Sequence, residues 1–159
     1  MVIFEKTLQL KLSELYTAEI AELYVILDSD FSFKDGGYTF DPYFSNDGFI
    51  YFRCWLLLKG KDFFEDMLKD IQTFSNEKYM FNIAHLEAEN LLYVSDAAYK
   101  CTHHSESFAP VRDTVFELYP KNHYDFGDNK MLREIFDDTQ IQKYYPLLVK
   151  KIYELKMNE

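Results

Sequence analysis

Arg53 is the residue whose chemistry most needs an explanation in this sequence. It is the only charged side chain between Asp47 and Lys59, within the most apolar stretch of the chain. A guanidinium that leaves water needs a carboxylate and further acceptors, because an unpaired buried charge is very costly. Glu87 and Glu89 are the nearest candidate partners, and we favour an Arg53–Glu89 ion pair that fixes the register of two helices. The alternative is an arginine that lines a pocket and holds an anionic ligand.

A second group of side chains with potential chemistry consists of Cys101, His103 and His104, with His123 further along the chain. Thiolate and imidazole are common zinc ligands. The Cys-x-His-His spacing, however, does not recur in structural zinc sites, and two adjacent histidines are awkward ligands for one ion. We therefore interpret this segment as a polar loop after a helix, and we predict no metal and no cofactor.

Five acidic and imidazole side chains could in principle meet in a cleft as general acid and base. They are Asp35, Asp41, Asp47, His85 and His123, and nothing in the sequence brings them together. The sequence contains no Gly-rich phosphate loop, nucleophile elbow, His-Glu-x-x-His or EF-hand pattern. We therefore expect a non-enzymatic protein rather than an enzyme.

The stretch from Ser45 to Gly60 is expected to be the central helix of the core. Asp47 is a good N-cap, because its short carboxylate can accept hydrogen bonds from the amides of the first turn. Gly60 is a good stop, because glycine can take the left-handed conformation that closes a helix. A helix that is apolar all round is a buried one, so Arg53 should be enclosed with it.

Further helices are predicted from apolar residues at helical spacing. Thr17 is the expected N-cap of the second helix, and Pro146 suits the first turn of the last one. Small residues in the segment 85–100 indicate that it packs directly on the central helix. Pro110 and Pro120 bracket one short element whose type stays open. The helices are predicted over residues 5–15, 18–27, 61–70, 85–100 and 131–136, with 139–145 leading into the last one. A loop is predicted over 73–82, and polar and turn residues dominate 102–129.

Residues 31–44 allow two interpretations. Phe31 and Phe33 alternate with polar residues, as do Tyr38 and Phe40, and turn-forming residues 35–37 lie between the two pairs. Such alternation is typical of a β-hairpin, here with a three-residue loop. The other interpretation is a loop that packs its own aromatic side chains against the core.

The length and the apolar spacing together predict a single compact multi-helix domain, all-α in class, over residues 1–159, and allow one short hairpin near 31–41. The net charge of −10 excludes nucleic acid as an expected partner and would attract a basic protein. No run approaches the 18 apolar residues of a membrane span, and the N-terminus lacks the pattern of a signal peptide. Two cysteines are too few for a disulfide framework. We therefore expect a cytoplasmic protein.

The helix Asp47–Leu56 and the segment Leu91–Tyr99 resemble two signatures of an uncharacterised family of small bacterial helical proteins, a domain of unknown function. The segments Thr17–Ile20 and Tyr145–Leu147 also resemble positions of that family. The likeness departs over residues 31–44, where a Trp-containing helical segment is expected and Gly36-Gly37 stand instead. The resemblance implies a helical fold and no known activity. The residues that carry it are Asp47, Gly48, Phe49, Tyr51, Phe52, Arg53, Trp55, Gly60, Glu89, Tyr93 and Tyr99.

Two functions from different classes are compatible with these observations. The first is a small acidic binding module whose Tyr-rich surface engages another protein, for example a basic toxin that it neutralises as an immunity protein would. The second is an enzyme or small-anion-binding domain with a pocket beside Arg53. Net charge, aromatic content and the missing catalytic motifs favour the first function.

Overall fold

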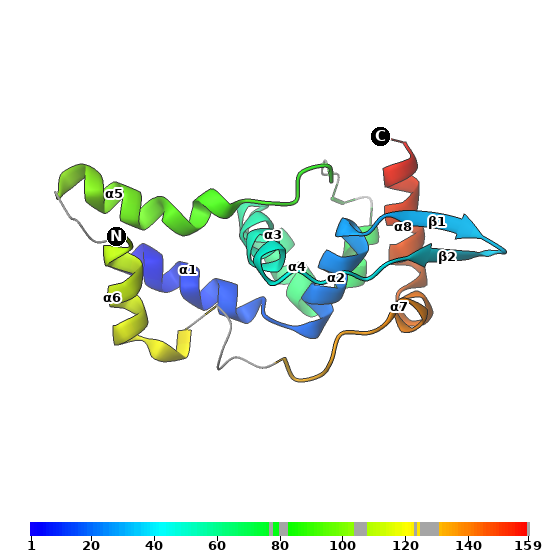
Figure 1. Cartoon of the computed structure of the whole chain (residues 1–159), viewed down its shortest axis with the longest axis horizontal. Helices are drawn as coiled ribbons and strands as arrows, with labels where there is room; N and C mark the ends of the chain where they lie inside the picture. The colour runs from blue at the N-terminus through cyan, green and yellow to red at the C-terminus, as the bar shows by residue number, and fades with distance from the viewer. Residues whose placement is uncertain (77, 80–82, 104–107, 123, 125–130, 159) are drawn as a thin grey trace.

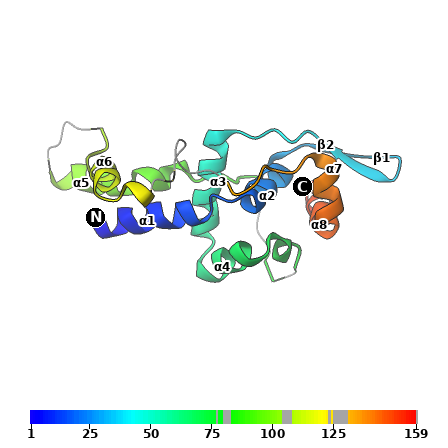
Figure 2. The same ribbon diagram turned by 90° about the horizontal axis from the view of Figure 1, so that it is seen from below.

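The computed structural model has the all-α fold expected from the sequence, with one short β-hairpin (Figure 1). It describes residues 1–76, 78–79, 83–103, 108–122, 124 and 131–158. The elements form an elongated body, with α1, α5 and α6 at one end and the hairpin with α7 and α8 at the other (Figures 1 and 2). In chain order they are α1 Val2–Glu14, α2 Ala18–Asp28, β1 Phe31–Lys34, β2 Gly37–Phe40, α3 Asn46–Leu58, α4 Lys61–Lys69, η1 Ile71–Ser75, η2 Glu89–Tyr93, α5 Val94–Thr102, α6 Pro110–Leu118, η3 Pro120–Asn122, α7 Asp138–Tyr144 and α8 Pro146–Met157.

Helix α3 is the central element, as predicted, because it contributes to two hydrophobic clusters at once. Its residues Phe49, Phe52 and Trp55 join the larger cluster, which also contains side chains of α2, α4, α7 and α8. Ile50 and Cys54 join the smaller one, which contains side chains of α1 and η2. An apolar residue on nearly every face is what a helix between two apolar surfaces requires.

The ends of α3 differ in detail from the prediction. Ser45, not Asp47, is the N-cap, and its hydroxyl accepts a 3.2 Å hydrogen bond from the Gly48 amide. Both residue types are good caps, and the observed one lies at the point where the backbone is still extended. Asp47 instead lies in the first turn, where its charge favours the positive end of the helix dipole. Gly60 lies at the corner between α3 and α4 and has a φ of +99°. Such a positive φ favours glycine, which has no Cβ.

Residues 31–40 form an antiparallel hairpin, the first of the two interpretations of this stretch, with Phe31 opposite Phe40 and Lys34 opposite Gly37. The loop has two residues rather than three, because Gly37 already belongs to β2. Asp35 and Gly36 both have positive φ, at 52° and 81°. Positive φ at both central residues is the requirement of the tight turn that matches the twist of the two strands.

Two predicted helices are wrong or only partly formed. Residues 85–88 are not helical, and the segment that follows is the 3-10 helix η2 before it becomes α5. The 3-10 helix η2 packs on α3, whereas α5 packs mainly on α6. Residues 131–136 form no helix but run as an extended strap, because Arg133 and the Phe136 amide are held by a buried glutamate described below. The element between Pro110 and Pro120 is the helix α6.

Helices α2 and α8 begin where the sequence predicts. Thr17 caps α2 through the Ile20 amide at 3.2 Å, and Pro146 begins α8. Leu148, Val149 and Ile152 of α8 are buried in the larger cluster. Across the described ranges, no helix is long and apolar enough to cross a membrane.

The two cysteines differ in exposure, and this leads to a simple prediction. Cys54 is buried in α3, and burial raises the pKa of its thiol to about 12 although the Arg53 charge opposes this. Cys101 is exposed. Because the thiolate is the nucleophile, iodoacetamide at pH 8 should alkylate Cys101 and spare Cys54 in the folded protein. Peptide mass spectrometry reads this out, with urea-unfolded protein as the control in which both react. Equal modification of both cysteines in folded protein would contradict the burial of Cys54.

Candidate functional site

Arg53 lies inside the core, with none of its surface exposed. Its Nη1 donates to the backbone oxygen of Leu12 at 2.9 Å, and its Nη2 donates to that of Tyr124 at 3.0 Å. The guanidinium also lies against two aromatic rings, with Cζ 4.7 Å from the Phe49 centroid and 5.0 Å from that of Tyr16. Arg53 therefore joins α1, α3 and Tyr124 at one point.

The predicted Arg53–Glu89 ion pair is wrong. Both residues are described, and no ion pair joins them; the Glu89 carboxylate is exposed and accepts a 2.7 Å hydrogen bond from the Tyr93 hydroxyl. Glu89 also lies beside Tyr51, and burial together with this carboxylate raises the pKa of the Tyr51 phenol. Thus Glu89, Tyr51 and Tyr93 form a small surface cluster, while backbone carbonyls accept from the arginine.

The remaining aromatic signature residues are explained by packing. Trp55 stacks on Phe52 with centroids 5.6 Å apart, and its ring edge meets Phe63. Tyr99 stacks on His103, with centroids 4.2 Å apart. These contacts give the residues a structural role within the core and along α5.

Gly48 is explained by a close approach of Tyr24. A Cβ at Gly48 would lie 2.2 Å from the Tyr24 hydroxyl oxygen and 3.1 Å from the ring carbon that bears it. The Tyr24 ring is buried between Phe44, Phe49 and Phe52 and has little room to shift. The glycine therefore leaves the space that the Tyr24 ring and its hydroxyl occupy.

Gly48→Ala should destabilise the protein by about 1–3 kcal/mol, because an added methyl group overpacks a core that cannot yield. Adding Tyr24→Phe removes the oxygen that clashes, so the double variant should be more stable than Gly48→Ala alone. Urea unfolding of the two single variants and the double variant measures this coupling. Strict additivity of the two effects would mean that the clash is relieved in another way.

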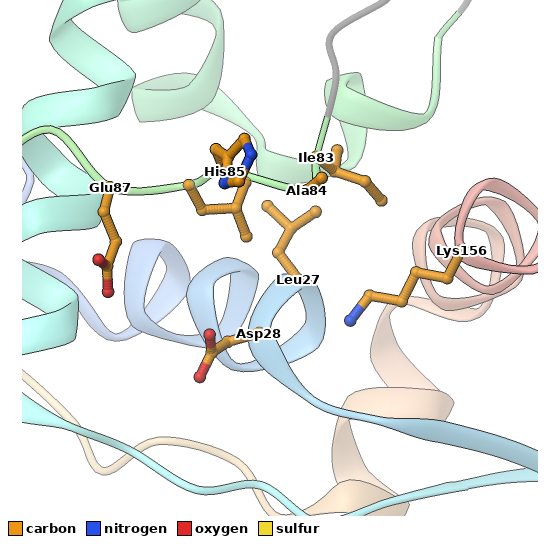
Figure 3. A pocket seen from close by; sticks show the side chains of 8 residues that line it. Leu27, Asp28, Ile83, Ala84, His85, Glu87 and Lys156 are labelled. Carbon is orange, nitrogen blue, oxygen red and sulfur yellow. The ribbon is translucent and has the colours of Figure 1, made fainter. Parts of the chain in front are cut away.

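Asp28 also lines a cavity of about 610 Å³ between the end of α2, residues 83–87 and the last turn of α8. Figure 3 shows Leu27 and Asp28 on α2, residues 83–87 along the opposite wall, and Lys156 reaching in from α8. The ionisable groups on its walls are Asp28, His85, Glu87 and Lys156. Arg53 is not among the lining residues, and the anion pocket considered beside it therefore has no counterpart in this cavity.

Negative charge is concentrated on one side of this cavity. Neither Asp28 nor Glu87 forms an ion pair with any residue that the structure describes. Burial, and then the Asp28 and Glu87 carboxylates, raise the pKa of the Tyr24 phenol above its usual range. That phenol therefore stays neutral beside the two carboxylates.

Lys156 is already bonded on the other side of the cavity. Its ammonium donates to the Ser29 backbone oxygen at 2.5 Å, and it lies 5.5 Å from the Phe31 ring centroid. Ser29 is the C-cap of α2, and cations are favoured at the negative end of a helix. The cavity wall thus has one cation held by backbone and two carboxylates that face solvent.

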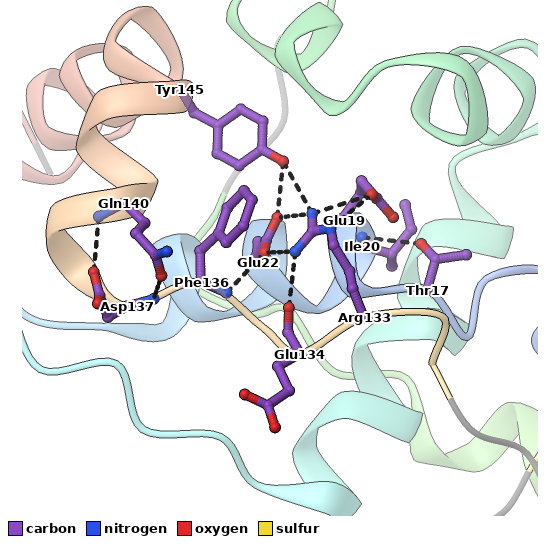
Figure 4. A network of polar contacts seen from close by, with 10 residues as sticks. All are labelled: Thr17, Glu19, Ile20, Glu22, Arg133, Glu134, Phe136, Asp137, Gln140 and Tyr145. Atoms are coloured by element: carbon purple, nitrogen blue, oxygen red, sulfur yellow. Dashed lines mark hydrogen bonds and ion pairs between the residues drawn. The ribbon is translucent and has the colours of Figure 1, made fainter.

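A buried glutamate holds the strap that leads into α7 and α8, and so helps to place Lys156. Glu22 of α2 is fully enclosed and receives hydrogen bonds from three directions (Figure 4). Arg133 Nη2 donates at 2.8 Å, the Phe136 amide at 2.9 Å and the Tyr145 hydroxyl at 2.8 Å. Arg133 also reaches the exposed Glu19 at 3.0 Å.

Of the four acid–base candidates that the structure describes, only His85 lies at the cavity. Asp35 lies in the hairpin turn, Asp41 follows β2 and Asp47 lies in α3; His123 lies outside the described residues. The cavity residues that sequence analysis missed are Asp28, which ends a helix, and Lys156, which belongs to a run of lysines typical of a helix C-terminus. Neither had a signal that distinguishes it from an ordinary surface charge.

The cysteine–histidine segment is only partly described. Cys101 and His103 lie at the end of α5, where the His103 Nδ1 contacts the Thr102 hydroxyl at 2.7 Å. His104 and His123 lie outside the described residues. Among the side chains that the structure describes, no group of three or more His, Cys, Asp and Glu residues could hold a metal ion.

The comparisons with known proteins agree with the family expected from the two helical signatures. No curated protein and no solved structure matches the chain. Residues 1–101 match DUF4240, described as a protein of unknown function. This match includes α1 to α4, both signature segments, and every ionisable group of the cavity except Lys156. Because it covers more than half of the sequence, the chain belongs to the DUF4240 family.

Proposed function

We propose that this protein is a non-enzymatic binding module that engages a basic protein, and that the cavity at Asp28 and Glu87 receives a cationic side chain of that partner. The observation that carries the proposal is the pair of carboxylates without an ion-pair partner at the edge of a 610 Å³ cavity. A lysine or arginine side chain supplies the missing charge.

The electrostatics of the surroundings support a cation as the ligand. The last carbonyls of α2 add the negative end of a helix dipole at Asp28. The net charge of −10 extends the attraction to long range and speeds the encounter with a basic surface. The two carboxylates, the end of α2 and the net charge all favour a cation, and they act against the one positive charge on the wall, that of Lys156.

The arrangement of His85 supports binding rather than catalysis. His85 lines the cavity but makes no hydrogen bond within the described part of the chain. A general base in a catalytic relay is commonly oriented by a third group, and no such group holds this imidazole. The cavity therefore offers charge and shape without an assembled acid–base pair.

The test is affinity capture from a lysate of the cells that encode the protein, with three tagged forms. The wild type should retain a basic protein at low salt and lose it at high salt, since exposed charges are screened. Asp28→Asn/Glu87→Gln should fail to retain it. Asp113→Asn/Glu117→Gln removes the same formal charge from exposed positions on α6, at the other end of the molecule, and should retain it.

Two outcomes would contradict the proposed function. One is a basic partner retained equally by the wild type and Asp28→Asn/Glu87→Gln, which would place the contact elsewhere. The other is no stoichiometric partner at low salt.

A further inference from the structure

The two edges of the hairpin differ in what covers them. The sheet has only the strands β1 and β2, so each strand has one edge that faces away from the other. On β2 the outward Tyr38 amide donates to Gln142 Oε1 of α7 at 3.1 Å. On β1, no residue of the described chain hydrogen-bonds to the outward backbone groups.

The register identifies these outward groups. With a two-residue turn, the flanking pair Lys34 and Gly37 exchanges hydrogen bonds across the hairpin, and such pairs then alternate along the strands. Phe33 opposite Tyr38 and Phe31 opposite Phe40 are therefore the pairs whose backbone groups point outward. The Gln142 contact to the Tyr38 amide agrees with this assignment.

We propose that a second copy of this chain pairs with the open edge of β1, antiparallel, with Phe31 opposite the second copy's Phe33. In this register the outward backbone groups of Phe31 and Phe33 in one copy bond to those of Phe33 and Phe31 in the other. Ser32 of each copy lies on the twofold axis. The two hairpins then form one continuous antiparallel sheet. The outward backbone groups of Phe31 and Phe33 in both copies are hydrogen-bonded in it.

The side chains on this edge are self-complementary in that register. Asp30 comes to lie opposite the second copy's Lys34, and twofold symmetry repeats the contact. Neither residue forms an ion pair within its own described chain. Opposite charges directly across an antiparallel pair are favourable and like charges are unfavourable. In the segment Asp30–Lys34, each residue thus lies opposite a favourable partner of the second copy when two copies pair antiparallel about Ser32.

The aromatic side chains add contact on one face. Phe33 is 53% exposed although it packs on Tyr38 and Tyr153. Opposite residues of an antiparallel pair project from the same face, so each Phe33 would meet the second copy's Phe31. Figures 1 and 2 show the tip of the hairpin projecting beyond the helical body, while the start of β1 lies beside α8; a second hairpin would reach the β1 edge from the side of the tip. The contact is small, so the dimer should be weak and concentration-dependent.

Closure of the assembly follows from the same contacts. The outer edge of β2 is met by Gln142 in each copy, so the joined sheet does not offer the same docking edge again. A twofold dimer, rather than a growing chain of subunits, is the product.

A charge exchange at Asp30 and Lys34 tests this dimer by sedimentation over a range of protein concentrations. Asp30→Lys and Lys34→Asp each place like charges opposite one another twice per dimer, and each should lower the association constant by about tenfold. The double variant Asp30→Lys/Lys34→Asp restores opposite charges and should restore association. Glu117→Lys makes the same charge change as Asp30→Lys at an exposed site on α6 and should not weaken it.

Three results would overturn the proposed dimer. They are a wild type that stays monomeric up to its highest soluble concentration, association unaffected by both single variants, and a double variant that associates no better than the singles. None of them bears on the cavity, because Asp30 and Lys34 are not among the residues that line it.

Discussion

Arg53→Met should lower the free energy of unfolding by about 3–5 kcal/mol, because each hydrogen bond to a charged donor contributes about 1.5–3 kcal/mol. Two buried backbone oxygens, those of Leu12 and Tyr124, lose such a donor at once. Methionine fills much of the volume but cannot donate. For a chain of this length the melting temperature should fall by about 10 °C. Urea unfolding followed by the fluorescence of Trp55 gives both the midpoint and the slope.

Arg53→Lys separates the charge of this residue from its geometry. A lysine keeps the positive charge, but its single ammonium cannot reproduce the planar fork that reaches two carbonyls on different segments. Its stability should therefore fall between those of the wild type and Arg53→Met. A methionine variant as stable as the wild type would contradict the structural role assigned to the arginine.

Glu22→Ala should cost about 3 kcal/mol, near the lower end for breaking a buried ion pair, because Arg133 keeps 30% of its side chain in water. The substitution also removes the acceptor of the Phe136 amide and of the Tyr145 hydroxyl. The strap over residues 131–137 and the helices that follow it should loosen together. Amide hydrogen exchange in α7 and α8 should rise more than in α3.

The matched control for Glu22→Ala is Glu19→Ala. Glu19 binds the same arginine from α2 but is 52% exposed, so its loss should cost well under 1 kcal/mol. Equal destabilisation by the two variants would mean that the effect arises from the charge of α2 and not from the buried contacts. If Glu22→Ala left the amide exchange rates in α8 unchanged, this would contradict the claim that the strap holds α8 in place.

The parts of the fold that can be predicted are those set by local pattern. Helix α3 follows from an apolar run between good capping residues, and the hairpin follows from alternation around Asp35-Gly36. The prediction selects the wrong N-cap, because Ser45 and Asp47 are equally good by type and only the path of the backbone decides between them. The strap over 131–136 has helical spacing, but the tertiary contacts of Glu22 override it.

The candidate site could not be predicted because its residues come from three separate segments. Asp28, Glu87 and Lys156 meet only after α2, the segment before η2 and α8 have packed. The partners of Arg53 escaped prediction for another reason. Its acceptors include the backbone oxygens of Leu12 and Tyr124. Every residue has a backbone oxygen, so the sequence does not mark which ones accept hydrogen bonds, and the prediction selects a glutamate side chain instead.

The most direct test of the cation-binding cavity is a nuclear magnetic resonance titration of the isotopically labelled protein with a short arginine-rich peptide. We expect saturable shifts of the amides of residues 27–29 and 83–87, which disappear in Asp28→Asn/Glu87→Gln and persist in Asp113→Asn/Glu117→Gln. Shifts spread over the acidic surface and unchanged in Asp28→Asn/Glu87→Gln would contradict it.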